Sequence, residues 1–175
     1  MKYVRTHLAL LLFFVLLAGC AAGPAGLPQY NYQEKAIQIN LKADAKLHWN
    51  EGTAHTLMLC VYQLRDINSF SQLSSTSEGL YSLLECRNSD PSMITASRVF
   101  IQPGESSLLT YDRAEGTRDV GVIAGYFDMR DENMVRAARI PVIKETTGFF
   151  KRTEIAYPGT LTMSLHLGSY GIISP

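Results

Sequence analysis

Apolar and polar residues alternate along several short stretches of the chain, which is the pattern of a strand with one buried face. Residues 37–42 read Ile-Gln-Ile-Asn-Leu-Lys, and residues 160–167 read Thr-Leu-Thr-Met-Ser-Leu-His-Leu. Successive side chains of a strand point to opposite faces of the sheet. Both stretches are therefore predicted to be half-buried strands.

Two nearly continuous apolar runs predict strands that are buried on both faces. They are Leu57–Leu64 and Val120–Phe127, and the glycines of the second run indicate a bulge or the close approach of another segment. Shorter candidate strands are residues 99–101, 107–111 and 139–143. The last of these contains Pro141, which favours the edge of a sheet.

Residues 69–84 interrupt the strand pattern. Their large apolar residues, from Phe70 to Leu84, recur at spacings that place them on one side of one or two helices. A glycine at position 79 and a serine-rich stretch before it argue against a single unbroken helix. Asp66 or Asn68 is placed to cap the start. We expect a mainly β fold, a two-sheet antiparallel β-sandwich with a short helical insertion between the second and third strands.

The start of the chain has the layout of a cleavable signal peptide. Lys2 and Arg5 precede an apolar run at residues 8–17, and small residues follow. This run is shorter than the roughly 20 apolar residues that a membrane-spanning helix needs. We therefore predict a signal peptide at residues 1–19.

The tetrapeptide Leu17-Ala18-Gly19-Cys20 resembles the bacterial lipobox. The resemblance implies that Cys20 carries a covalent diacylglycerol and an N-acyl lipid, and no other cofactor is expected. Several acyl chains on one residue give stable anchoring. Ala21 follows the cysteine, which resembles the sorting signal for release to the outer membrane. We expect a lipidated, flexible tether at residues 20–35 and the sandwich domain at residues 36–175.

Charge and cysteine content narrow the classes of function. Without the signal peptide the chain has 14 basic and 16 acidic side chains, a net charge of −2, which predicts no nucleic-acid partner. Cys60 and Cys86 remain after Cys20. An oxidising periplasm permits a bridge between them, and two separate buried thiols are the alternative. Without a nearby histidine cluster they make a poor zinc site, so we expect no metal.

The sequence contains no recognisable catalytic motif, and no enzyme is expected. It has no His-Glu-x-x-His, no Gly-x-Ser-x-Gly and no glycine-rich phosphate loop. His48 and His55 are placed to meet across a turn and are interpreted as polar surface. His166 is predicted to face solvent, and the charged residues 128–132 are predicted to form a solvated turn.

The segment from Lys46 to His55 connects the first two predicted strands and contains the only tryptophan of the chain, Trp49. Its residues 50–53, Asn-Glu-Gly-Thr, indicate a loop. A tryptophan beside a polar loop either packs into the core or serves as an anchor for a partner. Both interpretations remain open at this point.

Three segments of the chain resemble the TssJ family, the SciN-like outer-membrane lipoproteins of the type VI secretion system. They are Val61-Tyr62-Gln63-Leu64 with Asp66 and Phe70 behind it, Pro103-Gly104-Glu105, and residues 120–128, Val-Gly-Val-Ile-Ala-Gly-Tyr-Phe-Asp. The resemblance covers residues 37–173. It implies a transthyretin-like β-sandwich with added helices and a protruding loop, without enzymatic activity. After Asp128 many members carry a Trp-Arg pair, where this chain has Asn-Met-Val-Arg at residues 133–136.

The resemblance also implies a location and partners. The domain would hang from the outer membrane by its lipid, face the periplasm, and bind the periplasmic C-terminal domain of TssM, and indirectly TssL. The implied partner-binding loop consists of Lys46, Leu47, His48, Trp49, Asn50 and Glu51. The alternative function is a periplasmic lipoprotein whose sandwich binds a small ligand in a deep apolar pocket.

Overall fold

The computed structural model describes residues 26–128, 131–148 and 153–173, so Cys20 and the signal peptide lie outside the described residues. The chain divides into two compact units, which are described separately below. Gln29–Val142 and Pro158–Pro175 belong to one unit, and Ile143–Tyr157 belong to the other. The strands and helices are β1 Gln33–Ala43, β2 Leu57–Leu64, α2 Asn68–Ser74, α3 Ser77–Leu84, β3 Met93–Ile101, β4 Ser106–Arg113, β5 Asp119–Ala124, α4 Asp131–Met134, β6 Val135–Arg139, β7 Val142–Thr147, β8 Thr153–Pro158, β9 Leu161–Leu167 and β10 Ile172–Ile173.

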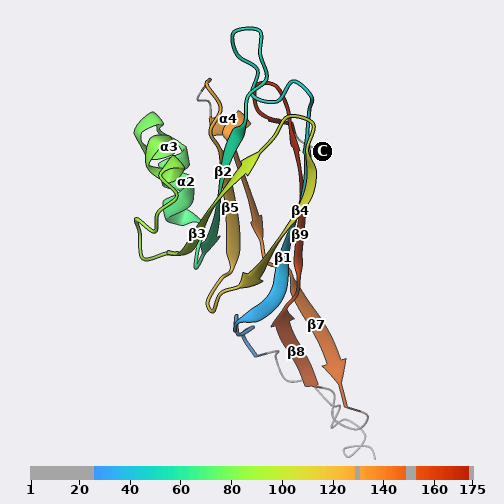
Figure 1. Cartoon of the computed structure of the whole chain (residues 1–175). Helices are drawn as coiled ribbons and strands as arrows, with labels where there is room; N and C mark the ends of the chain where they lie inside the picture. Colours follow the sequence, from blue (N-terminus) through green and yellow to red (C-terminus); the bar gives the residue numbers. More distant parts are fainter. Residues whose placement is uncertain (1–25, 129–130, 149–152, 174–175) are drawn as a thin grey trace, which may run out of the picture. The chain divides into compact units, whose positions relative to one another are not determined.

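The larger unit is a β-sandwich made of two four-stranded sheets (Figure 1). One sheet has the strand order β10-β9-β1-β4 and the other β3-β2-β5-β6. Apolar side chains of β1 and β9 join those of β2 and β5 in one buried cluster. The mainly β fold expected from the strand pattern is therefore confirmed.

β1 and β9 show the predicted alternation. Ile37, Ile39 and Leu41 are buried, whereas Asn40 and Lys42 are exposed. The expectation that all strand pairs are antiparallel is wrong here, because β1 and β9 run parallel, with Ile37 opposite Leu161. Alternation has the same period of two in parallel and antiparallel sheets, so the pattern carries no information on direction.

β1 also begins earlier than the sequence pattern indicated. It starts at Gln33, inside the segment expected to be tether. The Asp112 carboxylate of β4 accepts hydrogen bonds from the Tyr32 hydroxyl at 2.6 Å and from the backbone N–H of Lys35 at 2.8 Å. These polar contacts fix the start of β1 against β4. The spacing of apolar residues does not reveal them.

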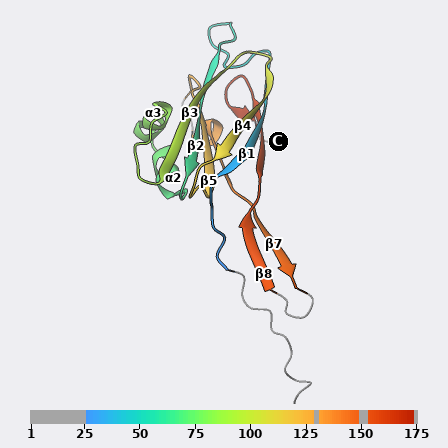
Figure 2. The ribbon, with the colours of Figure 1, turned by 60° about the horizontal axis from the view of Figure 1, so that its bottom comes forward.

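β2 and β5 are buried on both faces, as their apolar runs predicted. Helices α2 and α3 lie against the outer face of their sheet (Figure 2). The ring of Phe70 on α2 contacts the backbone of Gly121. A Cβ atom on residue 121 would lie 2.6 Å from the Cζ atom of Phe70, so the contact requires glycine. The glycines of this strand had indicated close backbone approach or a bulge, and at Gly121 the close contact is made by a side-chain ring.

The helical segment is divided in two at Ser75 and Thr76. Thr76 caps α3, because its side-chain oxygen accepts a hydrogen bond from the backbone N–H of Gly79 at 3.1 Å. The Asp66 carboxylate accepts from the backbone N–H of Asn68 at 3.0 Å, although the cap position of α2 is Ile67. Ser75 thus ends α2, and Thr76 starts α3 at the next position.

A disulfide joins Cys60 of β2 to Cys86, which follows α3, with their Cα atoms 5.5 Å apart. Nearby, the Tyr62 hydroxyl donates to the backbone carbonyl of Leu83 at 2.6 Å. A covalent bond and a buried hydrogen bond therefore hold the end of α3 to the sheet.

Pro141 separates two strands, and the single strand predicted at residues 139–143 is wrong. β6 ends at Arg139, and β7 begins at Val142. Proline has no N–H to donate to a neighbouring strand, so the ladder of the sandwich ends at this point. β7 then pairs with β8 in a two-stranded sheet of its own.

In that hairpin every residue of β7 is exposed. Lys144 and Glu154 form an ion pair at 3.7 Å across the two strands, and the Tyr157 hydroxyl donates to the Glu145 carboxylate. No helix in the described part of the chain has the length and apolar character of a membrane span.

Candidate docking surface

Residues 44–56 connect β1 to β2 and form a loop with a tight tip (Figure 1). Asn50 and Thr53 exchange two backbone hydrogen bonds, each of 2.9 Å. Glu51 and Gly52 between them have φ angles of 48° and 80°. A two-residue turn with both φ angles positive matches the right-handed twist of its flanking strands, and glycine in the second position relieves its strain. The loop tip is therefore a defined turn.

The base of this loop is fixed by its neighbours. Leu47 is completely buried, and its carbonyl accepts the backbone N–H of His55 at 3.0 Å. The backbone N–H of Trp49 donates to the carbonyl of Ser169 in the turn between β9 and β10, at 2.9 Å. The loop and this turn thus form one surface at one end of the sandwich.

The six residues of the implied partner-binding loop differ in what they present to solvent. Lys46 and Glu51 are exposed, and Trp49 and Asn50 are half-buried. The Lys46 ammonium lies 5.2 Å from the centre of the Trp49 ring. Leu47 and His48 are buried, so their side chains expose little surface for the contacts that the resemblance implies.

His48 is the centre of an aromatic cluster. Its ring stacks on Phe127 with centroids 4.2 Å apart and an angle of 27° between the planes. The ring of Tyr126 meets it edge-on at 5.7 Å, and the ring of His55 lies 6.0 Å away. The two histidines therefore meet as predicted, but His48 is buried and the interpretation of this residue as polar surface is wrong. Phe127 is 59% exposed and presents its outer face to solvent.

Burial is the main influence on the ionisable groups of this cluster. Desolvation lowers the pKa of His48, and the neighbouring His55 lowers it further, while the Thr56 carbonyl acts in the opposite sense. Burial also raises the pKa of the Tyr126 hydroxyl. Both groups are therefore held in their neutral forms near neutral pH.

Sequence reasoning missed Tyr126 and Phe127 as part of this surface. They lie 78 and 79 positions after His48, so no local pattern joins them. One signal was available: they lie two and three positions after a strand that is buried along its whole length. An aromatic pair at the end of such a strand lies where the chain leaves the core.

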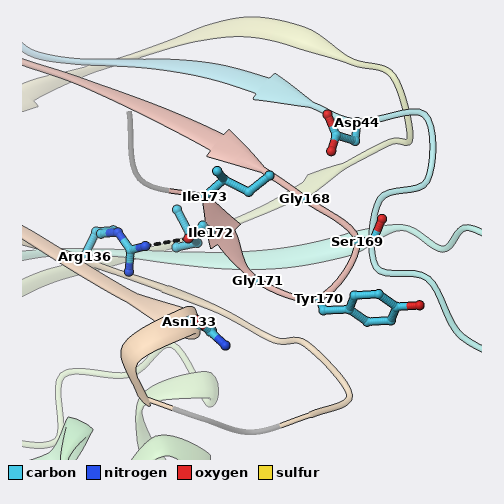
Figure 3. Close-up of a pocket in the computed structure, with 9 residues that line it drawn as sticks. All are labelled: Asp44, Asn133, Arg136, Gly168, Ser169, Tyr170, Gly171, Ile172 and Ile173. Carbon is cyan, nitrogen blue, oxygen red and sulfur yellow. Dashed lines mark hydrogen bonds between the residues drawn. The ribbon is translucent and has the colours of Figure 1, made fainter.

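A shallow cavity of about 670 Å³ opens beside the β9–β10 turn (Figure 3). Asn133 and Arg136 form one side, and the Arg136 guanidinium donates to the carbonyl of Ile172. The remaining lining residues are Asp44, Gly168, Ser169, Tyr170, Gly171, Ile172 and Ile173. Tyr170 is 64% exposed, which adds a second aromatic ring to this end of the molecule.

His166 lies on the face opposite the buried Leu165 and Leu167, as predicted, and its side chain is 35% exposed. Its Nε2 lies 2.7 Å from the Asp44 carboxylate, a contact that the sequence did not predict. Of the charged turn predicted at residues 128–132, residues 129–130 lie outside the described residues, and Asp131 begins the short helix α4. Among the residues that the structure describes, no three His, Cys, Asp or Glu side chains come together as a metal site.

Three solved structures share this fold. TssJ1 of Pseudomonas aeruginosa, described as a T6SS lipoprotein, is 20% identical, with 85% of this chain and 98% of that chain covered at a TM-score of 0.57. Serratia marcescens Lip, described as a membrane-bound component of the type VI secretion system, is 18% identical, with 78% and 94% covered at a TM-score of 0.58. A chain of a structure described as the TssM C-terminal domain from EAEC is 15% identical, with 79% and 97% covered at a TM-score of 0.55.

No curated protein sequence matches the chain. The family model of type VI secretion lipoproteins, described by the names VasD, EvfM and TssJ, matches residues 35–169. This range includes both sheets apart from β10 and the first two residues of β1, and also the loop at residues 44–56. The chain therefore belongs to the TssJ family of type VI secretion lipoproteins.

Proposed function

We propose that this lipoprotein docks the periplasmic C-terminal domain of TssM at the outer membrane, and so links the membrane complex, including TssL, to that membrane. The anchor would be the lipid on Cys20, and the sandwich, of transthyretin type, would face the periplasm. Its role would be structural and not enzymatic. Family membership supports this proposal, and so does the fold shared with a chain of a TssM structure.

The observation that carries the docking proposal is the surface formed by residues 44–56 and the β9–β10 turn. Its loop carries a half-buried tryptophan with a lysine over its ring, and the adjoining His48 stacks on the exposed ring of Phe127. The turn bound by the Trp49 N–H carries the exposed ring of Tyr170. Tryptophan and tyrosine are enriched among the residues that dominate binding energy, because they bury large areas with few rotatable bonds. A rigid base with exposed aromatic groups is a suitable surface for a protein partner.

The ligand-binding alternative expects a deep apolar pocket. The cavity beside the β9–β10 turn is shallow and carries Asp44, Asn133 and Arg136. This favours the docking proposal over the alternative.

Binding between the full-length lipoprotein in detergent and the purified periplasmic domain of TssM tests the proposal. The change Trp49→Ala is expected to raise Kd about 30-fold, the effect of losing roughly 2 kcal/mol at an interface centre. Tyr81→Ala is the control, because it removes an exposed aromatic ring, 64% exposed, from α3, outside the proposed docking surface. Its Kd is expected to stay within about twofold of the unchanged protein. No binding by the folded, unchanged lipoprotein would overturn the docking proposal.

The anchor is tested separately with Cys20→Ser. This change is expected to abolish type VI secretion in cells while leaving the fold and TssM binding intact, since only the lipid attachment is removed. Membrane fractionation and the binding assay above are the measurements. Secretion at the unchanged level would contradict the anchoring role.

A further inference from the structure

The protonation state of the His48 ring is set by its two nitrogens. Nδ1 lies 3.1 Å from the backbone carbonyl of Thr56. A carbonyl only accepts hydrogen bonds, so Nδ1 carries the proton of the neutral ring. Nε2 is buried, and it has no hydrogen-bond partner in the described part of the chain. A second proton would place an N–H donor and a positive charge at this atom.

The surroundings of His48 do not compensate for such a charge. The titratable groups against its ring are His55 of the same loop and the hydroxyl of Tyr126, which is itself buried without a partner among the described residues. Besides burial, Asp44 raises the pKa of Tyr126, and Arg136 lowers it. Both side chains are engaged elsewhere: Asp44 is bound by His166, and Arg136 donates to the carbonyl of Ile172.

Stacking on Phe127 gives a protonated ring some compensation. A cation over an aromatic face is attracted by the quadrupole of the ring. The cost of burying an unpaired charge is larger than this attraction. Desolvation therefore outweighs the stacking gain, and a protonated His48 is driven towards solvent.

The backbone at His48 favours such a movement. Its φ angle is 48°, in the left-handed region that residues with a side chain adopt at a cost. Its N–H makes only a long hydrogen bond of 3.4 Å to the carbonyl of Gly168. Moving the ring outward separates it from Phe127 and removes the support beneath the exposed phenyl ring.

We propose that protonation of His48 controls docking: the neutral ring holds Phe127 in place for the partner, and the protonated ring leaves the stack and weakens binding. This inference rests on the proposed function, because it concerns the same end of the sandwich. The partner would cover the outer face of Phe127 with apolar groups. Docking would accordingly weaken when the periplasm becomes acidic.

The test measures Kd between the full-length lipoprotein in detergent and the periplasmic domain of TssM at pH 7.5 and at pH 5.5. For the unchanged protein, Kd is expected to rise with acidification, by at most about tenfold per pH unit below the pKa of His48. His48→Phe keeps a ring in the stack and cannot be protonated, so this part of the pH dependence should disappear. His55→Gln is the comparison variant: it keeps His48, so the pH dependence should persist, with its midpoint moved to higher pH because His55 contributes to the lowered pKa of His48.

The outcomes separate the two proposals. Absence of binding at pH 7.5 overturns the docking function itself, and this inference with it. Binding that weakens equally in the unchanged protein and in His48→Phe overturns the role of His48 alone. Should His48→Phe fail to fold, an NMR titration of the unchanged protein tests whether the state of Phe127 follows the protonation of His48. The Phe127 ring resonances are expected to shift with the titration of His48, and independence of the two would overturn the inference.

Discussion

The layer of helices α2 and α3 and the loop at residues 44–56 both cover parts of the same sandwich, yet they are built differently. The helices are held by the Cys60–Cys86 disulfide and by the hydrogen bond from the Tyr62 hydroxyl to Leu83. The loop encloses His48 and lies over Tyr126, and the Nε2 and hydroxyl groups of these residues have no partner among the described residues. Satisfied polar groups stabilise a structure, whereas a buried unsatisfied group requires an explanation that includes function. The helical layer is thus cross-linked covalently to the sheet, whereas the loop is held by hydrogen bonds and packing around two unsatisfied polar groups.

The largest expected effect comes from removing the contact between the helices and the sheet. Phe70 is 1% exposed and packs on Gly121 and on Tyr62. Phe70→Ala should lower the free energy of unfolding by about 3–5 kcal/mol because it leaves a cavity. Chemical denaturation measures this, and TssM binding by the folded fraction should be unchanged. A large loss of binding by folded protein would show that the helices take part in docking.

The disulfide is expected to have the next largest effect. Its cysteines are separated by 26 positions, for which loss of the cross-link costs about 3 kcal/mol through the greater entropy of the unfolded chain. The double change Cys60→Ser with Cys86→Ser should lower stability by this amount, and so should reduction of the unchanged protein. Equal denaturation midpoints with and without reductant would contradict the structural role.

These elements show how far the sequence alone leads. Alternation predicted β1 and β9, and continuous apolar runs predicted β2 and β5, because one or both faces of these strands are buried. The parallel pairing of β1 with β9 was beyond prediction, since it joins segments more than 120 positions apart. The loop at residues 44–56 was located from its local sequence. The contact of His48 with Phe127 was not predicted, because these residues are also far apart in the chain.

A smaller effect is expected at the loop tip. Gly52 has a φ angle of 80° and open space around its Cα atom. Gly52→Val introduces a branched side chain in the left-handed region, at a cost of about 1–2 kcal/mol. We expect a denaturation midpoint lowered by this cost, and weaker TssM binding by the folded protein because the turn is displaced. Thr53→Val, one position on, is the matched control, and an equal loss of binding there would contradict the role of the turn.

The smallest expected effect is a pH dependence of stability. His48 has a folded pKa below its ordinary value of 6.5. Between these two values the unfolded chain binds a proton that the folded chain does not. Stability is therefore retained in full above about pH 6.5 and declines as pH falls towards the folded pKa. Thermal denaturation from pH 7.5 to pH 5.0 should show this decline, and His48→Phe should reduce it. An identical slope in both proteins would contradict the assignment to His48.

Hydrogen–deuterium exchange of the full-length lipoprotein, with and without the periplasmic domain of TssM, tests the central claim most directly. The account predicts that binding protects backbone amides of residues 46–53, of Phe127 and of the β9–β10 turn, while α2 and α3 exchange as before. Protection confined to the helical layer or to the β7–β8 hairpin, with no change in the loop, would contradict it.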